Sequence, residues 1–220
     1  MARVPFVEYD EATPGVQKVY EAQRDVMART SNNLKMLANA PHLLPFHLPL
    51  VMAVKFPGTG TLDEHVKVAI VLRVSVLNSC DYCVVHNTQF GSSSGTNADK
   101  MTAVQAEDWQ GTGLFDERET AALIWAERVA TNQARRDIAA FEEVSRHFTP
   151  GEIVEITYIA AHRTMMNLLQ EALWNDLEPP GTPEQTSDMP DGYLLDYAQN
   201  VLPEILKEVE AARSQRLQGR

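Results

Sequence analysis

The sequence predicts an all-α fold. Thr13, Asp63, Asp116 and Thr149 stand at four predicted helix starts, where a side-chain oxygen can cap the free N–H groups of a first turn. Few segments look like strands that could pair with one another, and a sheet needs such partners. The chain has 220 residues, of which 44% are hydrophobic, enough for a large domain with a substantial core.

The helix starts define the elements in order. Thr13 and Pro14 form an N-cap and first helical position, and predict a helix to about Thr30. Asp116 and Glu119 form a capping box ahead of a second helix. Thr149, Pro150 and Glu152 combine both signals and predict a long helix over about 150–175.

Other segments carry breakers. The stretch 41–57 is dotted with prolines and is predicted to hold only short apolar pieces. Residues 177–192 are rich in Pro, Gly and polar residues and are predicted to be a linker. The last segment, about 193–215, has a helical apolar pattern.

One segment is ambiguous. Residues 66–78, VKVAIVLRVSVLN, are rich in β-branched side chains, which favour strands. A strand that leads into a CxxC motif is also how a thioredoxin begins. We favour a buried helix over 62–77, apolar on nearly all sides, because burial overrides propensity.

Composition excludes several classes of protein. The net charge of −11 argues against nucleic acid as a partner and against docking on anionic membranes, which both need clustered Lys and Arg. The first residues show no apolar signal core, and no run is long enough to span a membrane. We therefore expect a cytoplasmic protein, in which two cysteines are not a structural disulfide.

The chemistry-bearing motif is CDYCVVH, which holds the chain's two cysteines, Cys80 and Cys83, and then His86. Ser79 is predicted to cap a helix that begins at Cys80, which favours a thiolate in the first turn. Cys83 lies on the same face one turn later, within reach of a disulfide. His86 shares that face and could exchange a proton with the thiol.

Alternatives for the cysteines stay open. A zinc site would need His162 as a further ligand, and two inert buried thiols are also possible. A c-type haem is excluded because Val84, not His, follows Cys83. We predict no metal and no cofactor. His162, Arg163 and Asn167 interrupt an apolar helix, either as a polar stripe at a subunit interface or as part of a site.

The motif and the opening RVPFVEYDEATPGVQKVYEA resemble the carboxymuconolactone decarboxylase superfamily, in its alkylhydroperoxidase D-like, peroxidase-related branch. The resemblance covers about residues 3–178 and implies a helical domain over 1–178, followed by a linker and C-terminal helix over 179–220. It implies that Cys80 and Cys83 are a redox pair assisted by His86. It also implies an oxidoreductase that acts on a hydroperoxide or disulfide and is recharged by an external thiol reductant.

Two positions depart from that family. The glutamate that its peroxidase members carry twelve residues before the first cysteine is Val68 here, and their histidine four residues after the second cysteine is Asn87. We therefore expect weak peroxidase activity and leave open which cysteine attacks. The alternative is a non-redox member, either a small-molecule isomerase or lyase or a scaffold, that keeps the cysteines structurally.

The resemblance also implies a homo-oligomer, as a dimer, trimer or hexamer. The apolar 62–77 segment and the striped tail helix support this expectation, because a second copy could cover them.

Overall fold

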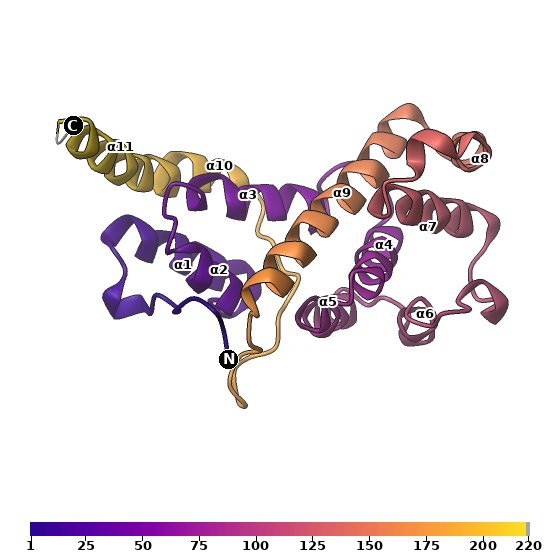
Figure 1. Cartoon of the computed structure of the whole chain (residues 1–220), viewed down its shortest axis with the longest axis horizontal. Helices are drawn as coiled ribbons and strands as arrows, with labels where there is room; N and C mark the ends of the chain where they lie inside the picture. The colour runs from indigo at the N-terminus through magenta and orange to yellow at the C-terminus, as the bar shows by residue number, and fades with distance from the viewer. Residues whose placement is uncertain (219–220) are drawn as a thin grey trace. The chain divides into compact units, whose positions relative to one another are not determined.

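The structure is a computed structural model that describes residues 1–218, and its regular secondary structure is all helical, with no β-strand in that range (Figure 1). The predicted all-α fold is therefore confirmed. The chain divides into two compact units, which are described separately: residues 1–53 with 173–220, and residues 54–172. The domain boundary predicted at 178 stays a prediction.

The first unit contains α1 (Pro14–Met27), α2 (Asn32–Leu37) and most of α3 (Leu44–Lys55). From the end of the chain it takes α10 (Tyr193–Asp196), a π-helical turn (Tyr197–Val201) and α11 (Leu202–Gln218). The linker predicted at 177–192 contains no helix, and the predicted tail helix is present.

The tail helix is fixed to α1 at one close approach. Gly15 has no side chain, and a Cβ there would lie 2.8 Å from Ile205 Cα in α11. The Gly15 N–H, one of the free donors at the start of α1, donates to Glu208 Oε1 at 2.7 Å. The tail therefore packs on the N-terminal helix of its own unit.

The prediction that residues 41–57 hold only short apolar pieces is wrong. α3 is one continuous helix of 12 residues that contains Pro49. Pro49 has no N–H for the carbonyl four residues earlier, on Pro45. The Tyr197 hydroxyl donates to that carbonyl at 3.3 Å. A side chain from the C-terminal segment therefore supplies the hydrogen bond that Pro49 cannot make.

The second unit holds α4 (Glu64–Leu77), α5 (Asp81–Ser93), α6 (Ala98–Ala103), α7 (Glu117–Ala130), α8 (Ile138–His147) and nearly all of α9 (Pro150–Leu173). α4 packs against both α5 and α7, and its middle is buried on all sides. Burial thus decides the ambiguous segment in favour of a helix. It also removes α4 as a surface that a second copy would need to cover.

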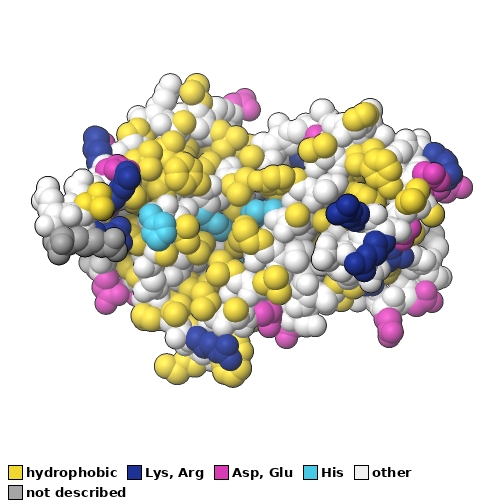
Figure 2. Space-filling view, turned by 45° about the horizontal axis from the view of Figure 1, so that its top comes forward, with side chains coloured by type: hydrophobic (Ala, Val, Ile, Leu, Met, Phe, Trp, Pro, Cys, Tyr) yellow, Lys and Arg dark blue, Asp and Glu magenta, His cyan; other side chains and the backbone are white. Residues whose placement is uncertain are grey.

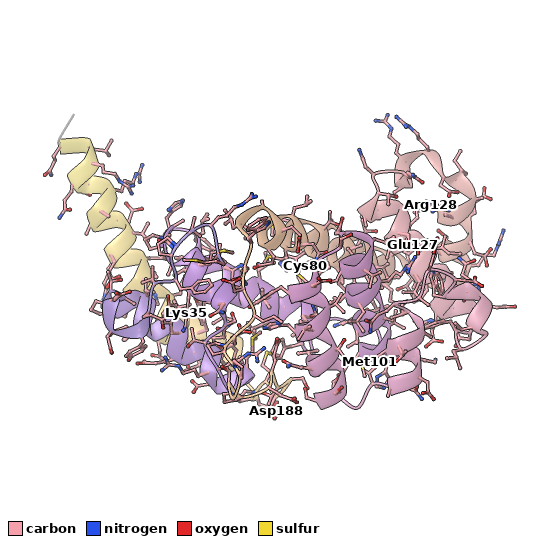
Figure 3. The ribbon with its side chains drawn as sticks, turned by 60° about the horizontal axis from the view of Figure 1, so that its bottom comes forward. Lys35, Cys80, Met101, Glu127, Arg128 and Asp188 are labelled. Atoms are coloured by element: carbon pink, nitrogen blue, oxygen red, sulfur yellow. A yellow bond between two sulfur atoms is a disulfide. The ribbon has the colours of Figure 1, made fainter. Side chains whose placement is uncertain are left out.

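Buried charge ties α4 to α7. Arg73 Nε donates to Glu127 Oε1 at 2.6 Å, and Trp109 Nε1 donates to the same oxygen at 2.9 Å. Figure 3 marks Glu127 and Arg128 on α7 and Cys80 before α5. Glu127 thus accepts two hydrogen bonds, which compensate for the burial of its charge. Because these bonds join particular residues, they fix how α4 and α7 are aligned along each other.

Two of the predicted caps are confirmed: Asp116 and Glu119 form the capping box of α7, and Asp63 caps the first turn of α4. Thr13 stands at the N-cap position of α1, but its side chain makes no capping hydrogen bond and donates to Glu208 of α11. Hydrophobic side chains also reach the surface among the charged groups (Figure 2). Among the described residues, no helix is both long and apolar enough to cross a bilayer.

Candidate functional site

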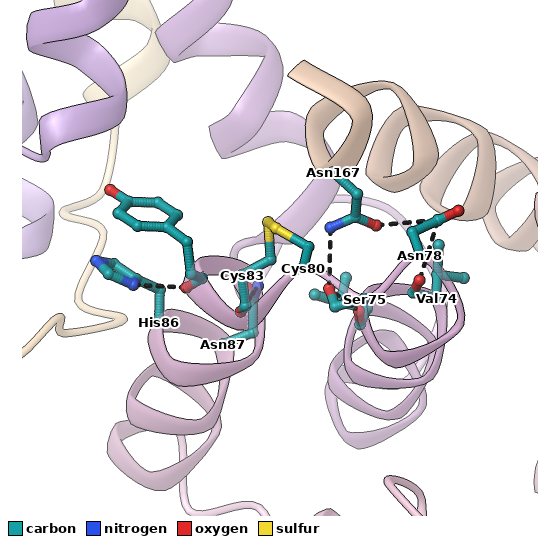
Figure 4. Close-up of a disulfide and its surroundings, with 10 residues drawn as sticks. Val74, Ser75, Asn78, Cys80, Cys83, His86, Asn87 and Asn167 are labelled. Atoms are coloured by element: carbon teal, nitrogen blue, oxygen red, sulfur yellow. Dashed lines mark hydrogen bonds between the residues drawn. A yellow bond between two sulfur atoms is a disulfide. The ribbon is translucent and has the colours of Figure 1, made fainter. Parts of the chain in front are cut away.

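Cys80 and Cys83 form a disulfide in the structure (Figure 4). Their Cα atoms are 5.2 Å apart, and both side chains are buried. The pair stands where α4 ends and α5 begins, joined only by Asn78 and Ser79. Two adjacent cysteines are thus held at one helix start.

The helix begins one residue later than predicted. Cys80, not Ser79, is the N-cap residue of α5, and Asp81 is its first residue. Ser79 lies in the left-handed region with φ 53°, and the Cys80 N–H donates to the Ser75 carbonyl at 3.0 Å. The left-handed conformation of Ser79 turns the chain away from α4. Cys80 therefore stands at the N-cap of α5, and Cys83 lies in the first turn of that helix.

Asn167 of α9 connects the end of α4 to the long helix. Its Oδ1 accepts from Asn78 Nδ2 at 3.2 Å, and its Nδ2 donates to Ser75 Oγ at 3.3 Å. Ser75 Oγ in turn donates to the Val71 carbonyl at 2.7 Å. This buried amide supports the residues that lead into Cys80 (Figure 4).

His86 lies one turn beyond Cys83 on α5. Its Nδ1 is 2.7 Å from the Tyr82 carbonyl oxygen, and its ring stacks on the Tyr82 ring at a centroid distance of 4.0 Å. Since a carbonyl only accepts hydrogen bonds, Nδ1 carries the hydrogen there, and the acceptor nitrogen of a neutral ring is then Nε2. The structure fixes the tautomer of His86, while its catalytic role stays a prediction.

The two positions that depart from the family pattern lie together. Val68 and Asn87 line one narrow void, with Lys55 and Lys67 among its other walls. Asn87 Nδ2 donates to the Cys83 carbonyl at 2.6 Å, and its buried Oδ1 has no hydrogen-bond partner among residues 1–218. The sequence alone could not show that two lysines face the place where an acid is missing.

The ammonium of Lys67 donates to the Thr59 carbonyl. Desolvation lowers the pKa of Lys67, although Glu155 and Glu64 act in the opposite direction. Lys55 Nζ lies 3.8 Å from the centroid of the Phe90 ring. Two lysine side chains therefore line the same void as Val68 and Asn87.

Arg163 is a buried cation on α9, one turn before Asn167 on the same face. Only 9% of the residue is exposed, and desolvation lowers its pKa to about 10. Its Nε has no hydrogen-bond partner within the described chain. His162 beside it is buried as well.

In residues 1–218, no group of three or more His, Cys, Asp and Glu side chains is arranged to hold a metal ion. The two cysteines are bonded to each other in this structure. What the arrangement offers is dithiol chemistry: a pair of adjacent sulfurs, a helix start that favours a thiolate, and a histidine with a defined tautomer.

Comparisons agree with the class of protein that this fold and site define. Residues 46–128 match the model of the carboxymuconolactone decarboxylase family. The matched range includes Cys80 and Cys83, and the match confirms the resemblance seen in the sequence. A crystal structure from Ralstonia eutropha JMP134, an alkylhydroperoxidase AhpD core described as an uncharacterized peroxidase-related protein, superposes with a TM-score of 0.71. It is 19% identical and covers 88% of this chain and 95% of its own.

Two further proteins are similar. The uncharacterized protein YnjA of Escherichia coli strain K12 is 27% identical over 96 residues, 44% of this chain, and the match spans about half of YnjA, 52%. The debrominase Bmp8, in complex with 2,3,4-tribromopyrrole, is 19% identical with a TM-score of 0.62, over 91% of this chain and all of its own. The fold is thus shared by proteins described as peroxidase-related and by a debrominase.

Proposed function

We propose that this protein is a dithiol oxidoreductase in which Cys80 and Cys83 reduce a hydroperoxide or a disulfide. The observation that carries the proposal is the bonded pair at the start of α5. A protein kept in the cytoplasm, where we expect this one to act, has little use for a structural disulfide across a single helical turn. A redox cycle gives the pair a function.

The cycle balances with one peroxide and one external dithiol. A thiolate attacks the peroxide, an S–O bond forms as the O–O bond breaks, and the alcohol leaves with a proton. The second cysteine attacks the resulting sulfenic sulfur, the S–S bond forms, and water leaves. An external thiol reductant of low molecular weight or protein origin then reduces the disulfide by exchange.

Residues of the chain supply the protons and the activation. The first turn of α5 favours a thiolate at both cysteines, by about 0.3–1 kcal/mol at an exposed site. We assign His86 to proton transfer through Nε2, because Nδ1 is bonded to the Tyr82 carbonyl. Asn87 binds the Cys83 carbonyl and so orients the turn that carries that sulfur.

Val68 favours a second candidate. A valine cannot accept a proton, and its partner position, Asn87, is an amide in place of a histidine. A non-redox member of the family, such as a small-molecule isomerase or lyase or a scaffold, would keep the cysteines for structure alone. The two candidates differ in whether electrons pass through the pair.

A measurement of peroxide consumption with excess dithiothreitol distinguishes the dithiol oxidoreductase from the non-redox candidate. We compare the parent with Cys80→Ser, Cys83→Ser and Ser79→Ala, the last as a matched control that keeps both sulfurs. We expect slow turnover in the parent and the control, and none in either cysteine variant. Turnover that survives in both cysteine variants, or is absent from a folded parent, would support the second candidate.

A further inference from the structure

The guanidinium of Arg163 on α9 is buried without a counter-charge. The residue is 9% exposed, and its guanidinium makes no hydrogen bond or ion pair with any residue of 1–218. Burial is the cause that lowers its pKa to about 10, and no carboxylate of the described chain opposes that change. The group is therefore charged at neutral pH and has nothing in this chain to neutralise it.

Arg73 shows how the same unit satisfies a buried arginine. It is 7% exposed, its Nε donates to Glu127 Oε1 at 2.6 Å, and its Nη1 donates to the Ala106 carbonyl at 2.9 Å. A buried charge without such partners is costly, because it has lost its contact with water and gained nothing in return. Arg163 departs from this rule, and such departures are typical of binding and catalytic sites.

Arg163 shares its face of α9 with other buried polar side chains. Asn167 and Gln170 follow it by four and seven residues, a spacing that places all three on one side of the helix. Asn167 donates to Ser75 Oγ, and the Ser75 carbonyl accepts from the Cys80 N–H at 3.0 Å. The face that carries Arg163 is thus the one that touches the chain beside the disulfide (Figure 4).

Two contacts align α9 with α4. Near the start of α9, Glu155 accepts from the Thr61 N–H at 2.8 Å, and twelve residues later Asn167 donates to Ser75 Oγ at 3.3 Å. The two helices therefore run in the same direction. Arg163 lies two thirds of the way from Glu155 to Asn167, so it stands level with the middle of α4.

The middle of α4 also lines the void beside Asn87. Val68 and Val71 belong to α4, Lys55 and Lys67 are the charged residues at this void, and no acid is among the residues that line it. In a chain of net charge −11, three basic side chains therefore stand around one level of α4. Positive charge gathered where water is excluded attracts an anion.

We propose that Arg163 binds a carboxylate of the substrate that the cysteine pair reduces, so that this substrate is an anionic hydroperoxide or disulfide. A guanidinium can hold a carboxylate by two parallel hydrogen bonds, and no residue of the described chain competes for the nitrogens of Arg163. The inference rests on the proposed dithiol function for the reaction, whereas binding of the anion can be measured without turnover.

Thermal unfolding of the oxidised protein with benzoate or benzamide measures the anion site by itself. The two probes have nearly the same shape and differ by one charge, and sodium chloride equalises the ionic strength. At ten times its dissociation constant, benzoate is expected to raise the melting temperature of the parent by about 3–6 °C, and benzamide to leave it unchanged. The shift should vanish in Arg163→Met and persist in Arg146→Met, a matched control that removes an exposed arginine from α8.

The melting temperatures without any probe separate binding from folding. Arg163→Met keeps an unbranched apolar side chain in place of an unpaired buried charge, so this variant is expected to be at least as stable as the parent. A variant that melts below the parent would show that the guanidinium already has a partner in the folded protein, and would overturn the proposal. No benzoate shift in the parent, a shift that benzamide reproduces, or one that Arg163→Met retains would overturn it as well.

Peroxide turnover with dithiothreitol then tests whether the bound anion belongs to the substrate. Cumene hydroperoxide and its para-carboxylate are a neutral and an anionic substrate of similar shape. Arg163→Met is expected to raise KM for the carboxylate about tenfold or more, with kcat and both constants for cumene hydroperoxide unchanged. Arg163→Lys should recover part of the loss, because it restores the charge without the paired donors.

The outcomes distinguish this inference from the proposed function. Equal effects of Arg163→Met on the two peroxides would overturn the assignment of the anion to the substrate. A parent that turns over neither peroxide, but keeps a benzoate shift that depends on Arg163, would overturn the dithiol function and the substrate assignment with it. The anion site would then stand alone.

Discussion

At the scale of single residues, the position of each cysteine in α5 decides its chemistry. Cys80 is the N-cap residue and Cys83 lies in the first turn, the part of a helix where free N–H groups and the helix dipole favour a thiolate. The helix dipole stabilises a thiolate there by about 0.3–1 kcal/mol, which lowers the thiol pKa by less than one unit at about 1.4 kcal/mol per unit. Activation beyond that must come from a proton acceptor, and the residue at the family's acceptor position is Val68.

Val68→Glu is predicted to raise peroxide turnover. Burial raises the pKa of the new carboxyl, but Lys55 and Lys67 line the same void and favour its ionised form. We expect a gain of up to about 10²-fold, the lower end of general-base contributions. The assay is peroxide consumption with excess dithiothreitol.

Val68→Gln is the matched control, since it has the same size and no charge. It is expected to leave turnover at the level of the parent. Equal rates in the Glu and Gln variants would show that a proton acceptor at residue 68 does not limit the reaction.

At the scale of elements, α3 shows how one helix depends on another. Pro49 removes an N–H from the helix interior, and Tyr197 donates its hydroxyl to the Pro45 carbonyl that would have accepted it. Burial raises the pKa of Tyr197, so the hydroxyl keeps its proton at any ordinary pH and remains a donor. The π-helical turn that carries Tyr197 therefore has a structural role in the first unit.

Tyr197→Phe is predicted to lower the free energy of unfolding by about 0.5–1.5 kcal/mol, the net worth of one hydrogen bond. Urea unfolding followed by circular dichroism measures it. In a Pro49→Ala background the helix can supply its own N–H to the Pro45 carbonyl, so the same change should cost less. A loss of equal size in both backgrounds would mean that the hydroxyl and the proline are not coupled.

α9 is fixed to the chain before α4 through Glu155. Desolvation raises the pKa of Glu155, but the hydrogen bonds from Thr61 and Leu62 outweigh it and leave the pKa below its ordinary value of 4.5. A lowered folded pKa contributes stability above the unfolded pKa, and that stability is lost as the pH falls through the folded value. The contribution is thus present at neutral pH and disappears in acid.

Glu155→Gln is therefore predicted to be less stable than the parent by about 1 kcal/mol at pH 7, the worth of a partly exposed hydrogen-bonded charge. The gap should shrink below pH 4.5, as the parent's carboxylate becomes protonated. Urea unfolding at pH 7 and at pH 3.5 gives both differences. A gap that is unchanged at pH 3.5 would assign the loss to packing and not to charge.

At the scale of the whole molecule, sequence motifs predicted the features that depend on residues close together in the chain. The capping residues Thr13 and Asp116 located α1 and α7, and the spacing of the two cysteines located the disulfide. The continuity of α3 was missed because Pro49 breaks helices in general, and its compensation by Tyr197 spans 152 residues. Asn167 was predicted to belong either to a polar stripe at a subunit interface or to a site, and nothing in the sequence shows that it meets Asn78 across 89 residues.

The apolar pattern of residues 62–77 could not show whether this segment is covered by its own chain or by a second copy. The 62–77 segment is apolar because it is the centre of the second unit. His162, Arg163 and Asn167, for which an interface was one of two predictions, are buried within this chain. Periodicity identifies an apolar face, but only the packed structure shows whether the chain itself covers it.

The proposed function requires that Cys80 and Cys83 pass electrons in the folded protein. The most direct test is intact mass spectrometry of the reduced, folded parent after one equivalent of hydrogen peroxide. We expect the loss of two hydrogens per chain, full recovery of the reduced mass with dithiothreitol, and a bond between Cys80 and Cys83 in the digest. Thiols that both remain reduced while the fold is intact, or that take up oxygen without bonding to each other, would contradict it.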